Sequence, residues 1–133
     1  MSIRKGLAIL GLAISLPLGA TPCATIDQSL TANQKQAWSP AIAKQLQVAT
    51  VDVLQVFRQG NWRIVYVDTH RSDNGFLFYR ADPRRSRYIT IWAGVAQSNE
   101  ETSIAQWAVA NVPGIPMALA QCFAWHVTQH RDM

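Results

Sequence analysis

The sequence predicts an α+β fold: a small antiparallel sheet of three to four strands, arranged as a meander and packed against an N-terminal helix and two C-terminal helices. Three short runs rich in β-branched and aromatic residues lie between residues 62 and 94, separated by turn-forming residues. The segments before and after them repeat apolar residues every three or four positions, as helices do. No internal repeat or linker interrupts the chain, so we expect one domain over residues 21–133, with the helices on one face of the sheet.

The N-terminal helix is predicted from the stretch WSPAIAKQL. Ser39 suits the N-cap and Pro40 the first helical position. Apolar residues then recur at helical spacing as far as Phe57, which predicts a helix to about Gln59, ended by Gly60. Val48, Thr50, Val51, Val53 and Val56 form a β-branched cluster, so residues 50–58 also suit a fourth strand.

The three strands follow in order. The first is WRIVYVDTH (residues 62–70), and Asn74-Gly75 is typical of the hairpin turn that would follow it. The second is FLFYR (residues 76–80). After a turn set by Asp82-Pro83, the third is YITIWAG (residues 88–94).

Two helices complete the predicted fold. Ser98 and Glu101 have the spacing of a capping box, which predicts a helix over about residues 99–111. The run NVPGIP interrupts it, and Pro116 favours a last helix that continues to about Gln129.

The first twenty residues have the layout of a secretory signal peptide. Arg4 and Lys5 precede an apolar run over residues 6–16, which is too short to span a bilayer, and Leu18-Gly19-Ala20 suits cleavage after Ala20. We therefore expect a periplasmic or secreted protein of 113 residues, without integral membrane insertion once it is processed. Its ten basic and eight acidic residues leave a formal charge of +2, which identifies no partner.

Cleavage after Ala20 keeps both cysteines in an oxidising compartment. We therefore predict a disulfide between Cys23 and Cys122. Cleavage after Ala24 would instead remove Cys23 and leave Cys122 as a lone thiol near His126.

The last helix carries a candidate metal site. His126 and His130 are four residues apart, so both imidazoles project from one side, but zinc normally takes three or four protein ligands. A third ligand would be His70, Asp132 or a free Cys122. The alternative interpretation is that His126 borders the core and that His130 lies in the chain terminus.

The two hairpins carry the candidate partner-binding residues. The first set is Asp68, His70, Arg71 and Asp73. In it, the Asp68 carboxylate could orient the His70 imidazole for acid–base chemistry. The second set is Arg80, Arg84, Arg85 and Arg87. Their planar guanidinium groups match the oxygens of phosphate or carboxylate. Polar turns and a solvated sheet edge are the simpler explanations of the two sets.

The sequence favours a small, exported, non-enzymatic binding protein that contacts a protein or an anionic envelope polymer through these hairpins. It contains no GxSxG or HExxH motif and no Gly-rich phosphate loop. We expect no cofactor and no nucleic-acid partner. Small exported inhibitors and immunity proteins share this size and build, but that architectural likeness assigns no residues. The alternatives are a metal-binding protein or metal-dependent enzyme using the C-terminal histidines, and a purely structural envelope component.

Overall fold

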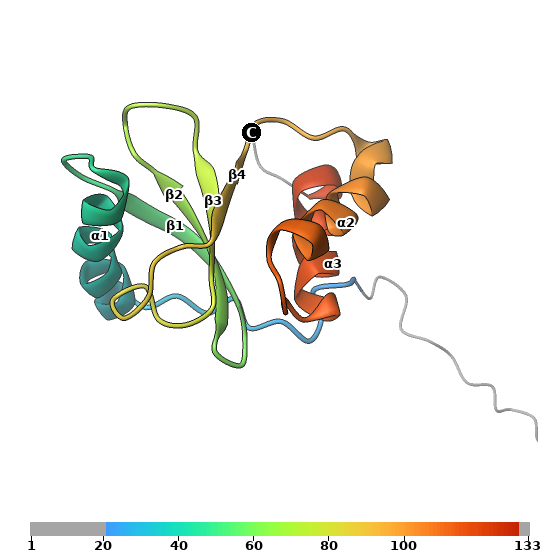
Figure 1. Cartoon of the computed structure of the whole chain (residues 1–133), viewed down its shortest axis with the longest axis horizontal. Helices are drawn as coiled ribbons and strands as arrows, with labels where there is room; N and C mark the ends of the chain where they lie inside the picture. The colour runs from blue at the N-terminus through green and yellow to red at the C-terminus, as the bar shows by residue number, and fades with distance from the viewer. Residues whose placement is uncertain (1–20, 131–133) are drawn as a thin grey trace, which may run out of the picture.

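Four strands form one antiparallel sheet in which each strand pairs with its sequence neighbours (Figure 1). The computed structural model describes residues 21–130. The strands, which lie in the order β1-β2-β3-β4, are β1 (Asp52–Gln59), β2 (Trp62–Asp68), β3 (Gly75–Tyr79) and β4 (Thr90–Ala93). The predicted α+β class and meander are confirmed. The predicted signal peptide and Asp132 lie outside the described residues.

The first helix, α1 (Ala32–Leu46), begins earlier than the sequence predicted. Thr31 is its N-cap: Thr31 Oγ1 accepts from Gln34 N at 3.1 Å, and Gln34 Oε1 accepts from Thr31 N at 3.0 Å. This reciprocal pair satisfies N–H groups at the helix start. Ser39 and Pro40 therefore lie inside the helix, and the predicted start at Ser39 was wrong.

The predicted continuation of this helix to Gln59 was also wrong. The helix ends at Leu46, where Gln47 adopts a left-handed φ of 58°, and residues 52–59 form the edge strand β1. Val53 and Val56 pack toward α1, whereas Phe57 packs on the opposite face of the sheet. The β-branched side chains thus fill a strand with both faces covered, where they pack better than in a helix. Leu54 is the extra residue of a bulge, since the register to β2 shifts between Val53 and Gln55.

Helices cover both faces of the sheet, and the expectation of helices on one face was wrong. Figure 1 shows α1 on one side and, on the other, α2 (Glu101–Asn111) and α3 (Met117–Gln129). All five residues of β3 are buried, as expected for a strand between two helical layers. The core on the α1 side includes Trp38, Ile42, Val56, Val65, Leu77 and Tyr79. The core on the α2 and α3 side includes Phe57, Ile64, Phe76, Phe78, Leu119 and Phe123.

Gly75 is required by packing rather than by a tight turn. It is the first residue of β3, and residues 69–74 form the connection from β2. A Cβ atom on Gly75 would lie 3.1 Å from Ile91 Cγ2 on β4. In the connection itself the left-handed residue is His70, with φ of 62°. Asn74-Gly75 therefore ends the loop instead of forming the predicted two-residue turn.

The C-terminal helices lie close to their predicted bounds. A short 3₁₀ helix, η2 (Ser98–Glu100), leads into α2. Glu100 Oε1 accepts from Gln97 N at 2.7 Å. The capping contact therefore joins Gln97 and Glu100, one residue earlier than the predicted pair of Ser98 and Glu101. Helix α3 follows Pro116, as expected. Across residues 21–130, no helix combines the length and apolarity needed to cross a bilayer.

Candidate functional site

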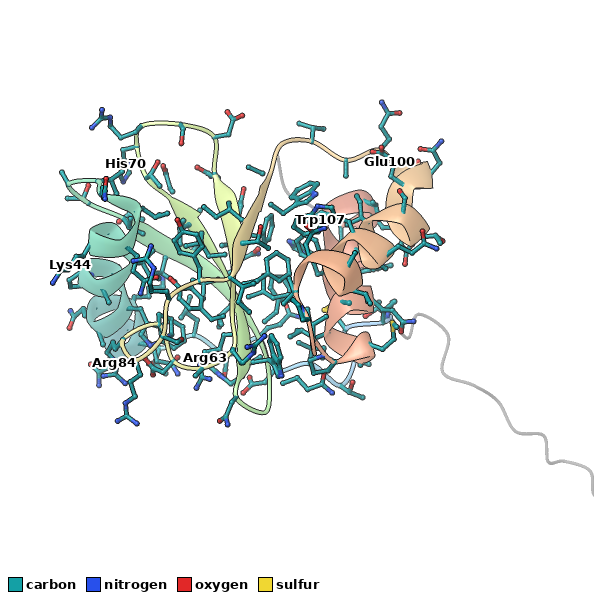
Figure 2. The ribbon with its side chains drawn as sticks, viewed as in Figure 1. Lys44, Arg63, His70, Arg84, Glu100 and Trp107 are labelled. Carbon is teal, nitrogen blue, oxygen red and sulfur yellow. A yellow bond between two sulfur atoms is a disulfide. The ribbon has the colours of Figure 1, made fainter. Side chains whose placement is uncertain are left out.

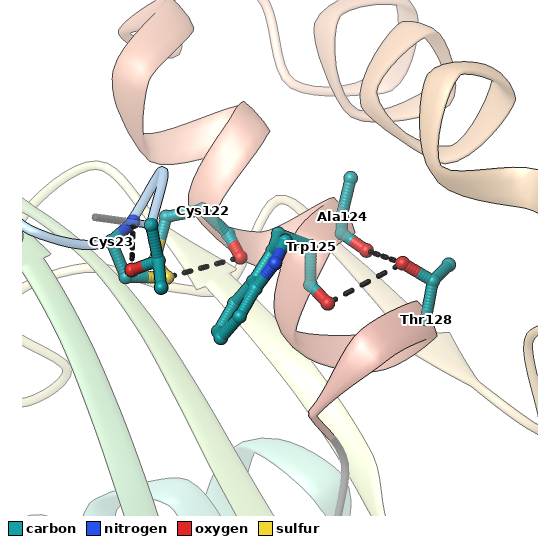
Figure 3. Close-up of a disulfide and its surroundings, with 6 residues drawn as sticks. Cys23, Cys122, Ala124, Trp125 and Thr128 are labelled. Atoms are coloured by element: carbon teal, nitrogen blue, oxygen red, sulfur yellow. Dashed lines mark hydrogen bonds between the residues drawn. A yellow bond between two sulfur atoms is a disulfide. The ribbon is translucent and has the colours of Figure 1, made fainter. Parts of the chain in front are cut away.

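The predicted disulfide is present and ties the N-terminal segment to α3. Cys23 and Cys122 are bonded, with their Cα atoms 4.5 Å apart, and both residues are buried. Figure 3 shows the disulfide beside α3, with Cys23 Sγ 3.3 Å from the carbonyl oxygen of Cys122. In the same helix, the Thr128 hydroxyl donates to the Ala124 carbonyl at 2.7 Å. The cysteines are therefore structural, and neither is a free thiol.

His126 and His130 occupy different environments. The His126 ring is buried and packs 4.9 Å from the Phe57 ring, whereas exposed His130 stacks on Trp125 at 5.2 Å. The two imidazole centroids are 6.3 Å apart. Both histidines line a pocket of about 380 Å³ beside the disulfide, together with Gln55. In the described part of the chain, no three His, Cys, Asp or Glu side chains are grouped to hold a metal ion.

His70 lies between two aspartates at the end of β2. Its Nε2 is 2.9 Å from Asp52 Oδ2, and its Nδ1 is 3.6 Å from Asp68 Oδ2. The backbone N–H of His70 also donates to Asp68 Oδ1 at 2.8 Å. Asp68 thus holds the backbone of His70, whereas the carboxylate nearest the imidazole is that of Asp52. The predicted continuation of the strand to His70 was wrong, since β2 ends at Asp68 and His70 has a left-handed φ of 62°. The cluster is open to solvent, since about half of the His70 side chain is exposed.

The structure separates the two predicted sets of partner-binding residues. In the sheet register, Asp52 pairs with Asp68 at one end, whereas Arg58 pairs with Arg63 at the other. The connection carrying His70, Arg71 and Asp73 leaves the first end, and the connection over residues 80–89 leaves the second. Strand β3 lies between them and spans about 13 Å at 3.3 Å per residue. The two sets therefore belong to opposite ends of the sheet.

Three of the four arginines of the second connection make specific contacts. Arg80 donates to the Pro113 carbonyl at 2.9 Å and lies 5.3 Å from the Trp62 ring centroid. Arg84 forms a two-point contact with Asp82, at 3.1 and 3.0 Å. The Arg84 contacts lower the pKa of Asp82 to about 2, partly offset by its burial. Arg85 and Arg87 are exposed, and Arg87 lies over the Tyr88 ring.

Two further arginines at this end were missed by the sequence analysis. Arg58 ends 2.9 Å from Asp27 and lies 5.9 Å from the Trp38 ring centroid, and Arg63 is its partner across β1 and β2. The sequence does indicate the hairpin that pairs them, because Gly60 and Asn61 join two runs of strand-forming residues. Treating residues 50–59 as helix concealed it.

The charges of the sheet are therefore segregated. We name the first group the arginine end: Arg58, Arg63, Arg80, Arg84, Arg85 and Arg87. It holds six of the seven arginines of residues 21–130, with two aspartates, Asp27 and Asp82, so four positive charges are unbalanced. The opposite end holds the other three aspartates of that range, with Arg71. Figure 2 shows Arg63 and Arg84 toward the bottom of the view and His70 toward the top.

Comparison with known proteins assigns the chain to no group. No protein-family model matches it, and no curated protein or solved structure is significantly similar to it.

Proposed function

We propose that this protein is a small exported binding module, without a catalytic role, that docks a carboxylate- or phosphate-bearing partner at its arginine end. The partner is the surface of an acidic protein or of an anionic envelope polymer. The module acts after its leader has been removed, in the periplasm or outside the cell.

The segregation of charge is the observation that carries this proposal. Six arginines drawn from β1, β2 and the connection after β3 share one end of the sheet with only two aspartates. The positive electrostatic potential of such a cluster raises the local concentration of an anionic partner and orients its approach. Guanidinium groups also suit the contact itself, because each fork matches two oxygens of a carboxylate or phosphate.

Export is supported by two independent features. The N-terminal sequence has the charge, the apolar run and the small residues of a cleaved leader. The Cys23–Cys122 disulfide is a bond that persists in oxidising compartments and is rare in the cytosol. The test is the intact mass and N-terminal sequence of the protein recovered from the producing cells. We expect a chain that begins at Thr21 and lacks two hydrogens relative to the reduced form; an intact leader with reduced cysteines would contradict export.

The binding test replaces Arg84, Arg85 and Arg87 together with serine. Purified protein is mixed with lipopolysaccharide, which bears phosphates, with peptidoglycan, and with polyglutamate, which bears carboxylates; the bound fraction is measured at two salt concentrations. We expect the triple variant to bind its ligand more weakly, by up to about tenfold, and with a smaller salt dependence. The loss is limited because each surface cation contributes modestly to the attraction.

Arg71→Ser is the matched control, since it removes an exposed arginine from the opposite end of the sheet. We expect it to bind within about twofold of the wild-type protein. The proposal is wrong if the triple variant binds as tightly as the wild type, or if Arg71→Ser causes the same loss. A lack of wild-type binding to all three ligands would also contradict it.

A further inference from the structure

Two arginines face each other across the first hairpin. Arg58 and Arg63 are directly paired in the antiparallel register of β1 and β2. Their side chains lie on the α1 face: Arg58 lies over the Trp38 ring, and the two arginines are two positions along their strands from Val56 and Val65 of that core. Like charges placed opposite each other in a sheet repel, so this pair is unfavourable unless another charge offsets it.

The carboxylates nearby offset it only in part. Asp27 pairs with Arg58 at 2.9 Å and is itself about half exposed. Arg63 donates Nη1 to the Asn61 carbonyl, and within residues 21–130 no carboxylate lies within 4.0 Å of its guanidinium. The third cation, Arg84, has Asp82 as its partner. The three guanidiniums thus have two carboxylates among them, and neither carboxylate forms an ion pair with Arg63.

The same two arginines each have a buried donor without a partner among residues 21–130. Arg58 Nη2 and Arg63 Nε are both buried without a hydrogen-bond partner in the described structure. A buried N–H group that has lost water and gained no acceptor is destabilising, and more so when it is charged. Burial, followed by the positive charges of Arg58 and Arg84, lowers the pKa of Arg63, and the negative charge of Asp82 offsets part of this effect. The group remains a cation, so an added anion is attracted by all three arginines.

We propose that Arg58, Arg63 and Arg84 form a binding site for one phosphate group, with Arg58 and Arg63 supplying buried donors and Arg84 closing the site from the solvent side. The three guanidinium groups come from β1, β2 and the connection after β3. Together they suit a tetrahedral group with several oxygens better than a planar carboxylate. About half of the Arg84 side chain is exposed, so it is free to exchange Asp82 for the ligand. This site deepens the proposed function, and rests on it, by naming where a phosphate-bearing partner is anchored.

The test measures thermal unfolding of the oxidised protein in inorganic phosphate, acetate or chloride at equal ionic strength. We expect 20 mM phosphate to raise the melting temperature of the wild type by about 5 °C over chloride, since a ligand that binds only the folded state stabilises it. Acetate should give less than half of that shift. An equal shift in acetate would mean that the site does not select phosphate and would overturn the proposal. No phosphate-specific shift would also overturn it.

Two variants assign the effect to these residues. Arg63→Met removes the charge that lacks an ion-pair partner and the unsatisfied Nε, so the phosphate shift should disappear while the variant in chloride melts no lower than the wild type. If Arg63→Met does not fold, Arg84→Gln provides the test at an exposed position, and its phosphate shift should fall at least twofold. Arg71→Gln, at an exposed arginine of the opposite end of the sheet, is the control that should keep the full shift. A full phosphate shift in Arg63→Met or Arg84→Gln would refute the assignment.

Lipopolysaccharide with and without its phosphates distinguishes a polymer-borne phosphate from the free ion. Stronger binding of the phosphorylated form, lost in Arg63→Met, would identify the polymer as the source; a response to inorganic phosphate alone would identify the free ion. Polymer binding that depends on Arg85 and Arg87 but not on Arg63 would refute this site and leave the proposed function standing.

Discussion

Removal of the disulfide should destabilise this protein by an amount comparable to the whole stability of many small domains. The bond joins positions 99 residues apart, so the loop that it closes contains every strand and the first two helices. In the loop-entropy model, a cross-link that closes about 100 residues restricts the unfolded chain and stabilises the fold by about 4.7 kcal/mol. Small domains are stable by about 5–15 kcal/mol in total.

The double variant Cys23→Ala/Cys122→Ala tests this magnitude. It also removes two sulfur atoms from buried positions, Cys122 being fully buried, which adds about 1 kcal/mol for the space left behind. With a urea dependence of about 1.5 kcal/mol per molar, the combined loss of about 5.7 kcal/mol lowers the unfolding midpoint by about 3.8 M. The slope should also rise, because the unfolded chain expands and exposes more surface once its cross-link is gone.

Urea unfolding followed by tryptophan fluorescence measures both quantities. The matched control is the wild-type protein kept reduced, which loses the bond and retains both sulfur atoms. It should show nearly all of the destabilisation. The reasoning is refuted if the reduced wild type loses less than about 1.5 kcal/mol, because the segment around Cys23 would then be held to α3 without any contribution from the closed loop.

Two further predictions concern other contacts. Gln45 accepts from the buried Tyr79 hydroxyl at 2.8 Å and donates to two carbonyls of the connection after β3, so Gln45→Ala should lower the free energy of unfolding by about 2–3 kcal/mol. Tyr79→Phe should lower it by less, because it removes one of these hydrogen bonds. Chemical denaturation of both variants measures the two losses, and the reverse order would contradict this account. Hydrogen bonds from Ser29 lower the pKa of Asp27 to about 2, and those from Arg84 do the same for Asp82, so both groups contribute stability above their ordinary pKa of 3.8 that is lost as the pH falls toward 2. Asp27→Asn/Asp82→Asn should show a flatter fall in melting temperature between pH 4 and pH 2, and an unchanged fall would contradict the assignment.

Local patterns in the sequence were sufficient for much of this fold. The runs at 62–68, 75–79 and 90–93 combine β-branched and aromatic residues between turn signals, and Pro116 marks the start of the last helix. These features depend on residues close together in the chain, where propensity and turn chemistry act directly. The pairing of Cys23 with Cys122 was also predictable, since a chain with two cysteines in an oxidising compartment allows one intramolecular bond.

The ambiguous segment at residues 50–59 was decided by tertiary contacts. Its valines suit either a helix or a strand, and its pairing with β2 between two helical layers made it a strand. The same pairing brought Arg58 opposite Arg63, and the meander placed Asp68 and Arg84 at opposite ends of the sheet. The sequence by itself determined the local elements and the number of charges. Only the tertiary structure decided which charges are neighbours, because electrostatic interactions depend on distance in space and strand pairing changes that distance for residues far apart in the chain.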